Sequence, residues 1–177
     1  MTKRELVENF FIMAGAMDGE EPMTNLRLNK MMFLAQAWCL TKTGNLLFDE
    51  PFLAWTYGPV IRATYDTYKA NGAAPILLVN EEFNITDIEE DVQDILFAVY
   101  GRYGTAGTDA LVDLTHSVPA WRAARDEADQ VISYKAVQEH FDSLEEMKTT
   151  KDFVGKIPIL ETVNEEGALI LPADWSE

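Results

Sequence analysis

The sequence predicts a mainly α-helical fold: a single compact helical domain with a short extended segment near residues 48–57 and a β-hairpin at the C-terminus. Apolar residues recur three and four positions apart over most of residues 1–147, residues that start and stop helices bracket these stretches, and the pattern changes after Lys148. A chain of 177 residues, 47% of them hydrophobic, is long enough to bury roughly 70% of its unfolded surface. We therefore expect a helical domain over 1–147 and an extension over 148–177.

A first helix is predicted from Thr2 and Glu5, which have the spacing of a capping box. In a capping box each side chain accepts a hydrogen bond from the other residue's backbone amide. Apolar residues follow at helical spacing, and the helix ends before Gly19.

A second, longer helix is predicted after Pro22, with Thr24 or Asn25 as its cap. It runs to about Thr43, where Gly44 is typical of a helix C-terminus. Apolar residues at three-and-four spacing lie on one face of this helix, and they include Leu28, Met31, Met32, Ala35, Trp38 and Cys39. We expect this helix to form the centre of the core.

The next stretch mixes extended and helical signals. Residues 48–55 are too short and too interrupted by Pro51 for a helix, which favours an extended segment. Proline suits the first position of a helix, so Pro59 predicts a helix over 59–69 that ends at the Asn-Gly pair following it. Residues 76–79 are typical of a short strand.

The remaining helices are each preceded by a capping residue or a proline. They are expected over 86–103, with Thr86 and Glu89 as a second capping box, over 108–114 with Thr108 as cap, from Pro119, and over 133–147 with Ser133 as cap. After these, apolar residues over 157–163 and 168–171 flank a turn-like Asn-Glu-Glu-Gly sequence, which predicts the C-terminal hairpin. The hairpin either covers a patch of its own domain or contacts a partner.

The charge of the chain is large and unevenly placed. The net charge is −16, and residues 81–177 hold 22 acidic against 7 basic side chains, whereas residues 1–80 hold 8 against 7. The electrostatic field of this negative charge repels phosphate backbones, so direct binding of nucleic acid is disfavoured. A solvated acidic surface and a basic protein partner explain the charge equally well.

The sequence favours a cytoplasmic protein. Its single cysteine, Cys39, has apolar neighbours and cannot form an internal disulfide, which is typical of a buried thiol in a reducing compartment. No apolar run approaches the roughly 20 residues that cross a bilayer, so no membrane contact is expected.

Few residues suit catalysis or metal binding. The chain has two histidines and one cysteine, so we expect no metal site and no cofactor. Asp113 and His116 have a spacing that can orient an imidazole as a general base, although no nucleophile accompanies them. A structural role for His116 is the more common outcome at this spacing. Lys30 and Arg62 lie in apolar segments, where each would need a buried or half-buried anion.

Aromatic residues are the strongest remaining signal. Most of them suit a helical core. Trp55 and Tyr57 differ, because alternate residues of an extended segment point the same way, and an exposed pair of this kind is a candidate hot spot for protein binding.

Several sequence blocks resemble the Panacea domain of SocA-like antitoxins, a family also described as phage-associated proteins. The blocks are Leu28-Asn29-Lys30, the segment from Leu47 to Phe52, Ala54-Trp55 with Tyr57-Gly58-Pro59-Val60, and Leu114-Thr115-His116 followed by Trp121. They occur in the family's order over about residues 5–145. The run Pro119-Ala120-Trp121 is one residue longer than the family's usual Pro-Trp pair.

The resemblance implies a mostly helical antitoxin that neutralises a cognate protein toxin by direct contact, and in one branch an adaptor that delivers the toxin to a cytoplasmic protease. The shared motif is then mainly scaffold: Leu28, Asn29, Lys30, Trp38, Phe48, Pro51, Gly58, Pro59, Val60, Thr115, His116 and Trp121. Variable surface is expected to bind the partner, with Trp55, Tyr57, Arg62, Glu165, Glu166 and Trp175 as candidates.

Two other functions remain open at this point. An acidic phage-borne protein can imitate nucleic acid and inhibit a host nuclease, which requires regular rows of exposed carboxylates. A small-substrate enzyme would depend on His116 with an acidic partner. We favour the antitoxin, which is not an enzyme and has no catalytic residues.

Overall fold

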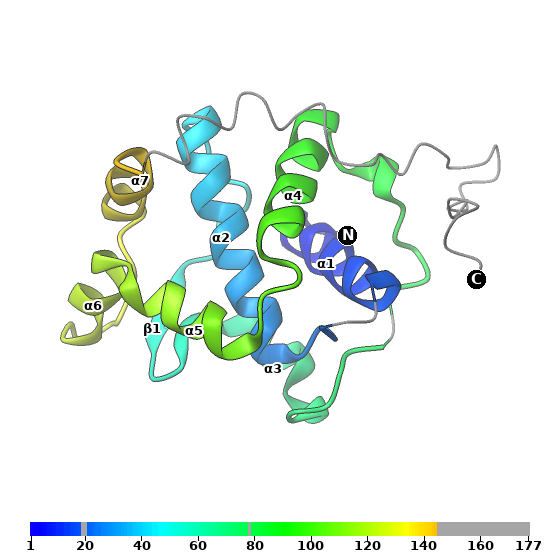
Figure 1. Cartoon of the computed structure of the whole chain (residues 1–177), viewed down its shortest axis with the longest axis horizontal. Helices are drawn as coiled ribbons and strands as arrows, with labels where there is room; N and C mark the ends of the chain where they lie inside the picture. Colours follow the sequence, from blue (N-terminus) through cyan, green and yellow to red (C-terminus); the bar gives the residue numbers. More distant parts are fainter. Residues whose placement is uncertain (19–20, 78, 145–177) are drawn as a thin grey trace.

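The computed structural model describes residues 1–18, 21–77 and 79–144, and it is mainly helical (Figure 1). The predicted C-terminal hairpin lies outside the described residues. The described helices are α1 (Lys3–Asp18), α2 (Asn25–Thr43), α3 (Arg62–Tyr68), α4 (Glu90–Tyr103), α5 (Thr108–Ser117), α6 (Pro119–Arg125) and α7 (Tyr134–Asp142), with 3₁₀ turns η1 (Lys69–Asn71) and η2 (Ile85–Asp87). Strands β1 (Phe52–Trp55) and β2 (Gly58–Ile61) form one antiparallel pair.

Helix α2 is the centre of the core, as predicted, and the other elements surround it. It contacts α1, α3, α4, α5, α7 and β2, and Figure 1 shows it in the middle of the molecule. All residues from Arg27 to Leu40 are buried, so the helix has no solvent face at all along that length. The prediction of a single apolar face was too narrow, because a helix enclosed on every side also buries its polar residues.

Most helix boundaries follow the predicted caps. The Thr2 and Glu5 capping box forms, since each backbone amide donates to the other's side chain at 2.8 and 3.2 Å. Thr24 accepts from the Arg27 amide at the start of α2, and Gly44 ends that helix with a φ of +72°. Ser133 caps α7 in the same way, by accepting from the Ala136 amide.

Several local predictions were wrong. Thr108 is the first residue of α5 rather than its cap, which is Gly107, and no side chain caps that helix. Pro59 lies in β2 rather than at a helix start, so the helix predicted from Pro59 begins only at Arg62. Thr86 belongs to a 3₁₀ turn capped by Asn84, and α4 starts without a side-chain cap. The described residues of 76–79 form no strand.

Candidate functional site

The β-hairpin of β1 and β2 is held along both of its edges. The strands pair in the register Phe52–Ile61, Leu53–Val60, Ala54–Pro59 and Trp55–Gly58. Beside β1, the Ala54 amide donates to the Gln130 carbonyl at 2.8 Å, and the Ile132 amide donates to the Phe52 carbonyl at 2.9 Å. The outer edge of β2 faces α2 instead of another strand.

Polar side chains of α2 pair with the backbone that faces that helix. The Asn29 side-chain oxygen accepts from the Ile61 amide at 2.9 Å, and the Lys30 ammonium donates to the Pro59 carbonyl at 3.0 Å. Nearly two turns further on, Gln36 accepts from the Leu47 amide and donates to the Phe48 carbonyl, both at 2.9 Å. Since unpaired polar groups are costly in a core, these buried residues fix the path of the segment through the hairpin.

Gly58 is required where β2 begins. Its φ is +103°, and a Cβ there would lie 2.8 Å from Lys30 Cε and 3.0 Å from Thr115 Oγ1. Because both neighbours are themselves buried, they have little room to move. Glycine is therefore the one residue that brings the turn this close to α2 and α5.

Lys30 is fully buried without an anion, contrary to the sequence-based expectation. Its hydrogen-bond partner is a carbonyl, and burial lowers the pKa of its ammonium to about 7. With this pKa the amine is only about half protonated at pH 7, so it depends less on a counter-ion, which explains how the core accepts it.

Helices α5 and α6 support the turn from the other side. Trp121 donates its indole N–H to the Trp55 carbonyl at 3.3 Å and stacks on His116, with ring centroids 4.0 Å apart. Burial and the charge of Lys30 lower the pKa of His116, against a smaller opposite effect of Asp113. The His116 Nε2 atom is buried and has no hydrogen-bond partner among the described residues, so this ring packs against Trp121 and offers no exposed Nε2 to a substrate.

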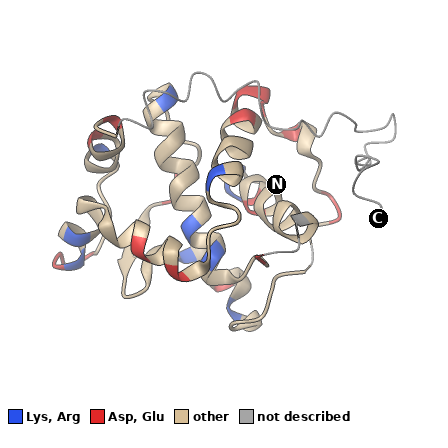
Figure 2. Cartoon of the chain, viewed as in Figure 1, with Lys and Arg blue, Asp and Glu red and all other residues tan. Residues whose placement is uncertain are grey.

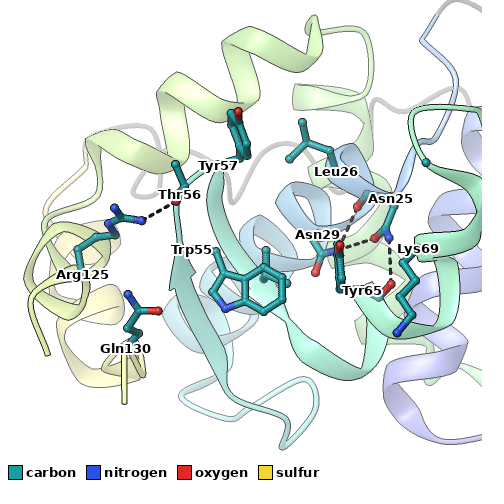
Figure 3. Close-up of a pocket in the computed structure, with 12 residues that line it drawn as sticks. Asn25, Leu26, Asn29, Trp55, Thr56, Tyr57, Tyr65, Lys69, Arg125 and Gln130 are labelled. Atoms are coloured by element: carbon teal, nitrogen blue, oxygen red, sulfur yellow. Dashed lines mark hydrogen bonds between the residues drawn. The ribbon is translucent and has the colours of Figure 1, made fainter. Parts of the chain in front are cut away.

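A groove of about 640 Å³ lies beside the hairpin, where residues at the start of α2, in α3 and at the end of α6 line it together with the hairpin. Figure 3 shows Trp55 in its middle, Arg125 and Gln130 on one side, and Asn25, Tyr65 and Lys69 on the other. The groove is lined by Asn25, Leu26, Asn29, Trp55, Thr56, Tyr57, Val60, Tyr65, Lys69, Gly72, Arg125 and Gln130.

Exposed apolar side chains gather at this groove. Tyr57 is 69% exposed, and Tyr65 and Leu26 are 38% and 37% exposed. The rings of Trp55 and Tyr65 meet edge to face at 5.0 Å, which gives the groove a rigid aromatic floor. Exposed aromatic groups on a rigid support are typical of protein-binding hot spots.

The charge of the groove is opposite to that of the chain. Lys69 and Arg125 line it, and none of the Asp and Glu residues that the structure describes does. Acidic residues lie elsewhere, at the start of α4 and along α5 (Figure 2). The groove is thus a locally cationic surface on a protein with a net charge of −16.

The structure brings together part of the predicted binding set. Trp55 and Tyr57 both line the groove. Arg62 does not; it lies over the Trp55 ring at 5.8 Å and pairs with Asp66 at 2.9 Å, so its anion is exposed, whereas a buried or half-buried anion was expected. The remaining candidates, Glu165, Glu166 and Trp175, lie outside the described residues.

Of the predicted scaffold residues, most are buried around α2 and the hairpin. Leu28, Trp38, Phe48, Val60 and Thr115 have at most 6% of their surface exposed, whereas Pro51 is exposed. Sequence reasoning missed Leu26, Tyr65, Arg125 and Gln130 as groove residues. A positive φ of 55° at Gln130 distinguishes that residue, but no sequence pattern signals it.

Other polar clusters have structural partners. Glu8 is buried with Arg4, Thr64 and Tyr68, and accepts from the Thr64 hydroxyl at 2.5 Å. Arg27 donates to the Gly104 and Ala106 carbonyls and so ties α2 to the loop after α4. Within the described ranges, no cluster of His, Cys, Asp and Glu is arranged to hold a metal ion, and no helix is long and apolar enough to span a membrane.

A family model described as "Antitoxin SocA-like, Panacea domain" matches residues 28–122. The match covers more than half of the chain, from the polar turn of α2 through the hairpin to Trp121 and Arg122. The chain belongs to this family. No curated protein and no solved structure matches the chain significantly. The Panacea range thus contains the hairpin, its supports on α2, α5 and α6, and most of the groove.

Proposed function

We propose that this protein is an antitoxin that neutralises a cognate protein toxin by binding it directly. Membership of the SocA-like antitoxin family carries the proposal. The exposed aromatic groove supports it, because such a surface suits a protein partner and most of its lining residues lie within the family range.

The acidic half of the chain supports a toxin that is basic overall. Residues 81–177 carry 22 acidic and 7 basic side chains. Attraction between opposite charges speeds the encounter of two proteins, and salt screens it beyond about 8 Å at physiological ionic strength. Association with a basic toxin should therefore slow as salt rises, whereas a salt-insensitive association rate would remove this part of the proposal.

The direct test is co-expression with the product of the neighbouring open reading frame. Inducing that product alone should reduce colony counts, and inducing both proteins should restore them. The two proteins should then purify together as a complex of fixed stoichiometry. A harmless neighbour, or toxicity that this chain cannot relieve, would contradict the antitoxin and favour a nuclease inhibitor, for which competition with duplex DNA is the next measurement.

A titration separates binding from catalysis. An antitoxin that acts by occlusion protects only when it is present in at least equal amount to the toxin, whereas an enzyme protects at a small fraction of that amount. His116→Ala is the matched variant, since it removes the one imidazole that sequence reasoning offered as a base. Loss of protection at unchanged binding in this variant would favour the enzyme.

An adaptor role adds a separate expectation. If the protein also delivers its toxin to a cytoplasmic protease, the half-life of the toxin should shorten when both are expressed in normal cells. The half-life should lengthen again in cells that lack the protease. An unchanged half-life in both strains would leave occlusion as the whole mechanism.

A further inference from the structure

Among the described residues, the groove beside β1 and β2 contains one half-buried cation, Arg125, that has no carboxylate partner. Arg125 donates to the Thr56 hydroxyl at 3.3 Å and lies over the Trp121 ring at 5.6 Å. No carboxylate of the described residues lies within ion-pair distance of it, although Asp126, Glu127 and Asp129 follow closely in sequence. A guanidinium has five N–H donors in a planar fork, so most of its capacity is unused here.

The other cations near the groove differ in this respect. Arg62 and Lys69 both pair with Asp66, each at 2.9 Å, and this arrangement lowers the pKa of that carboxyl. Asp66 therefore compensates part of the charge of these two cations within α3 and η1. Arg125, on α6, lies across Trp55 from Lys69 (Figure 3). The groove thus has one end where the cations share a carboxylate and one end where Arg125 has no carboxylate partner among the described residues, with aromatic rings between them.

We infer that the groove binds a segment of the toxin that places a large apolar side chain against Trp55 and Tyr57 and a carboxylate against Arg125. The inference rests on the proposed function only in naming the toxin as the source of the segment. Charge complementarity carries the rest, since a planar arginine fork binds a carboxylate through two parallel hydrogen bonds. The acidic surface elsewhere attracts the toxin as a whole and speeds the encounter, whereas this groove binds one acidic segment of the toxin.

A nucleotide fits the groove less well. A triphosphate carries several negative charges, and Arg125 is the single groove cation without an ion pair among the described residues. A ligand with one apolar side chain and one carboxylate matches the aromatic rings and Arg125, because its single negative charge then pairs with Arg125.

The test uses a display library of random 12-residue peptides with the full-length chain as bait. Peptides enriched on the wild type should combine Phe, Trp or Leu with a nearby Asp or Glu. Binding of a selected synthetic peptide should fall at least tenfold with Arg125→Glu and with Tyr57→Ala. Arg122→Glu is the matched control, because it makes the same charge change one turn earlier on α6 at an exposed residue outside the groove. It should change the affinity by less than about twofold.

Exchanging the charges of the peptide's acidic residue and of Arg125 tests whether these two groups contact each other directly. A peptide whose acidic residue is replaced by lysine should bind the wild type weakly and the Arg125→Glu chain more tightly. Circular dichroism and thermal melting of each variant show whether the fold is intact. Enriched peptides that are basic or lack a carboxylate, peptides that bind Arg125→Glu as well as wild type, or competition by ATP but not by acidic peptides would each overturn the inference.

The same variants separate this inference from the proposed function. If the wild type protects against the toxin and Arg125→Glu and Tyr57→Ala protect equally well, the groove is not the toxin site, and the antitoxin proposal stands. If the peptides behave as expected but the wild type does not bind the toxin, the proposed function fails while the chemistry of the groove holds.

Discussion

The two sides of the same β-hairpin differ in what they do with polar and aromatic groups. On the α2 side, Asn29 and Lys30 are buried and bonded to the backbone of β2. On the groove side, Tyr57 is 69% exposed and Arg125 lacks a carboxylate partner among the described residues. The difference shows that buried polar residues of α2 hold the hairpin in place, while the groove leaves an aromatic ring exposed and an arginine without a carboxylate partner among the described residues.

The largest effect is expected from Gly58→Ala. A Cβ at this residue meets the buried Lys30 and Thr115 side chains at 2.8–3.0 Å, and its φ of +103° is unfavourable for alanine. We expect the free energy of unfolding to fall by about 3 kcal/mol, measured by urea denaturation. Gly44→Ala is the matched control, because its φ is also positive but nothing lies within 4 Å of the added carbon. It should cost about 1 kcal/mol, and equal losses in the two variants would contradict the close fit of the hairpin to α2.

The next effect is expected from Asn29→Ala. The change leaves the Ile61 amide without its acceptor in a buried place, which should lower the free energy of unfolding by about 1–3 kcal/mol. Urea denaturation measures this loss. A loss below about 0.5 kcal/mol would show that the β2 edge does not depend on α2.

Lys30 should make stability depend on pH. The pKa of the buried ammonium is about 7, below the pKa of a lysine in the unfolded chain. At a pH between these two pKa values, the unfolded chain binds a proton that the folded chain does not. The wild type should therefore gain stability relative to Lys30→Met as the pH rises above 7, by up to about 1.4 kcal/mol per pH unit. Urea denaturation of both proteins at pH 7 and at about pH 9 gives the difference. A difference that does not change with pH would mean that Lys30 stays charged in the core.

The smallest effect on stability is expected from Tyr57→Ala. The ring is mostly exposed and the structure gives it no hydrogen bond to another described residue, so the free energy of unfolding should change by less than about 0.5 kcal/mol. Affinity for the toxin should fall by about 2 kcal/mol, measured by calorimetry. If the variant loses stability but keeps its affinity for the toxin, Tyr57 has a structural role rather than a binding role, which would contradict the difference drawn between the two sides of the hairpin.

The helices of this protein were largely predictable because their signals are local. Thr24, Gly44 and Ser133 act on backbone groups within a turn of themselves, so their spacing in the sequence is enough to place the ends of α2 and the start of α7. Pro59 misled the prediction because proline suits the edge of a strand as well as a helix start, and which of the two forms depends on a distant partner, the ammonium of Lys30.

The sequence by itself determined the helical class, the central place of α2 and, through the Leu-Asn-Lys and Trp-Thr-Tyr-Gly-Pro-Val blocks, the family. The tertiary structure decided which side of the hairpin is buried and which is open. It brought Tyr65 of α3 and Arg125 of α6 to the same groove, although 60 positions separate them in the chain. Local sequence patterns cannot predict that these two residues lie in one groove, because their positions depend on how helices far apart in sequence pack around one buried helix.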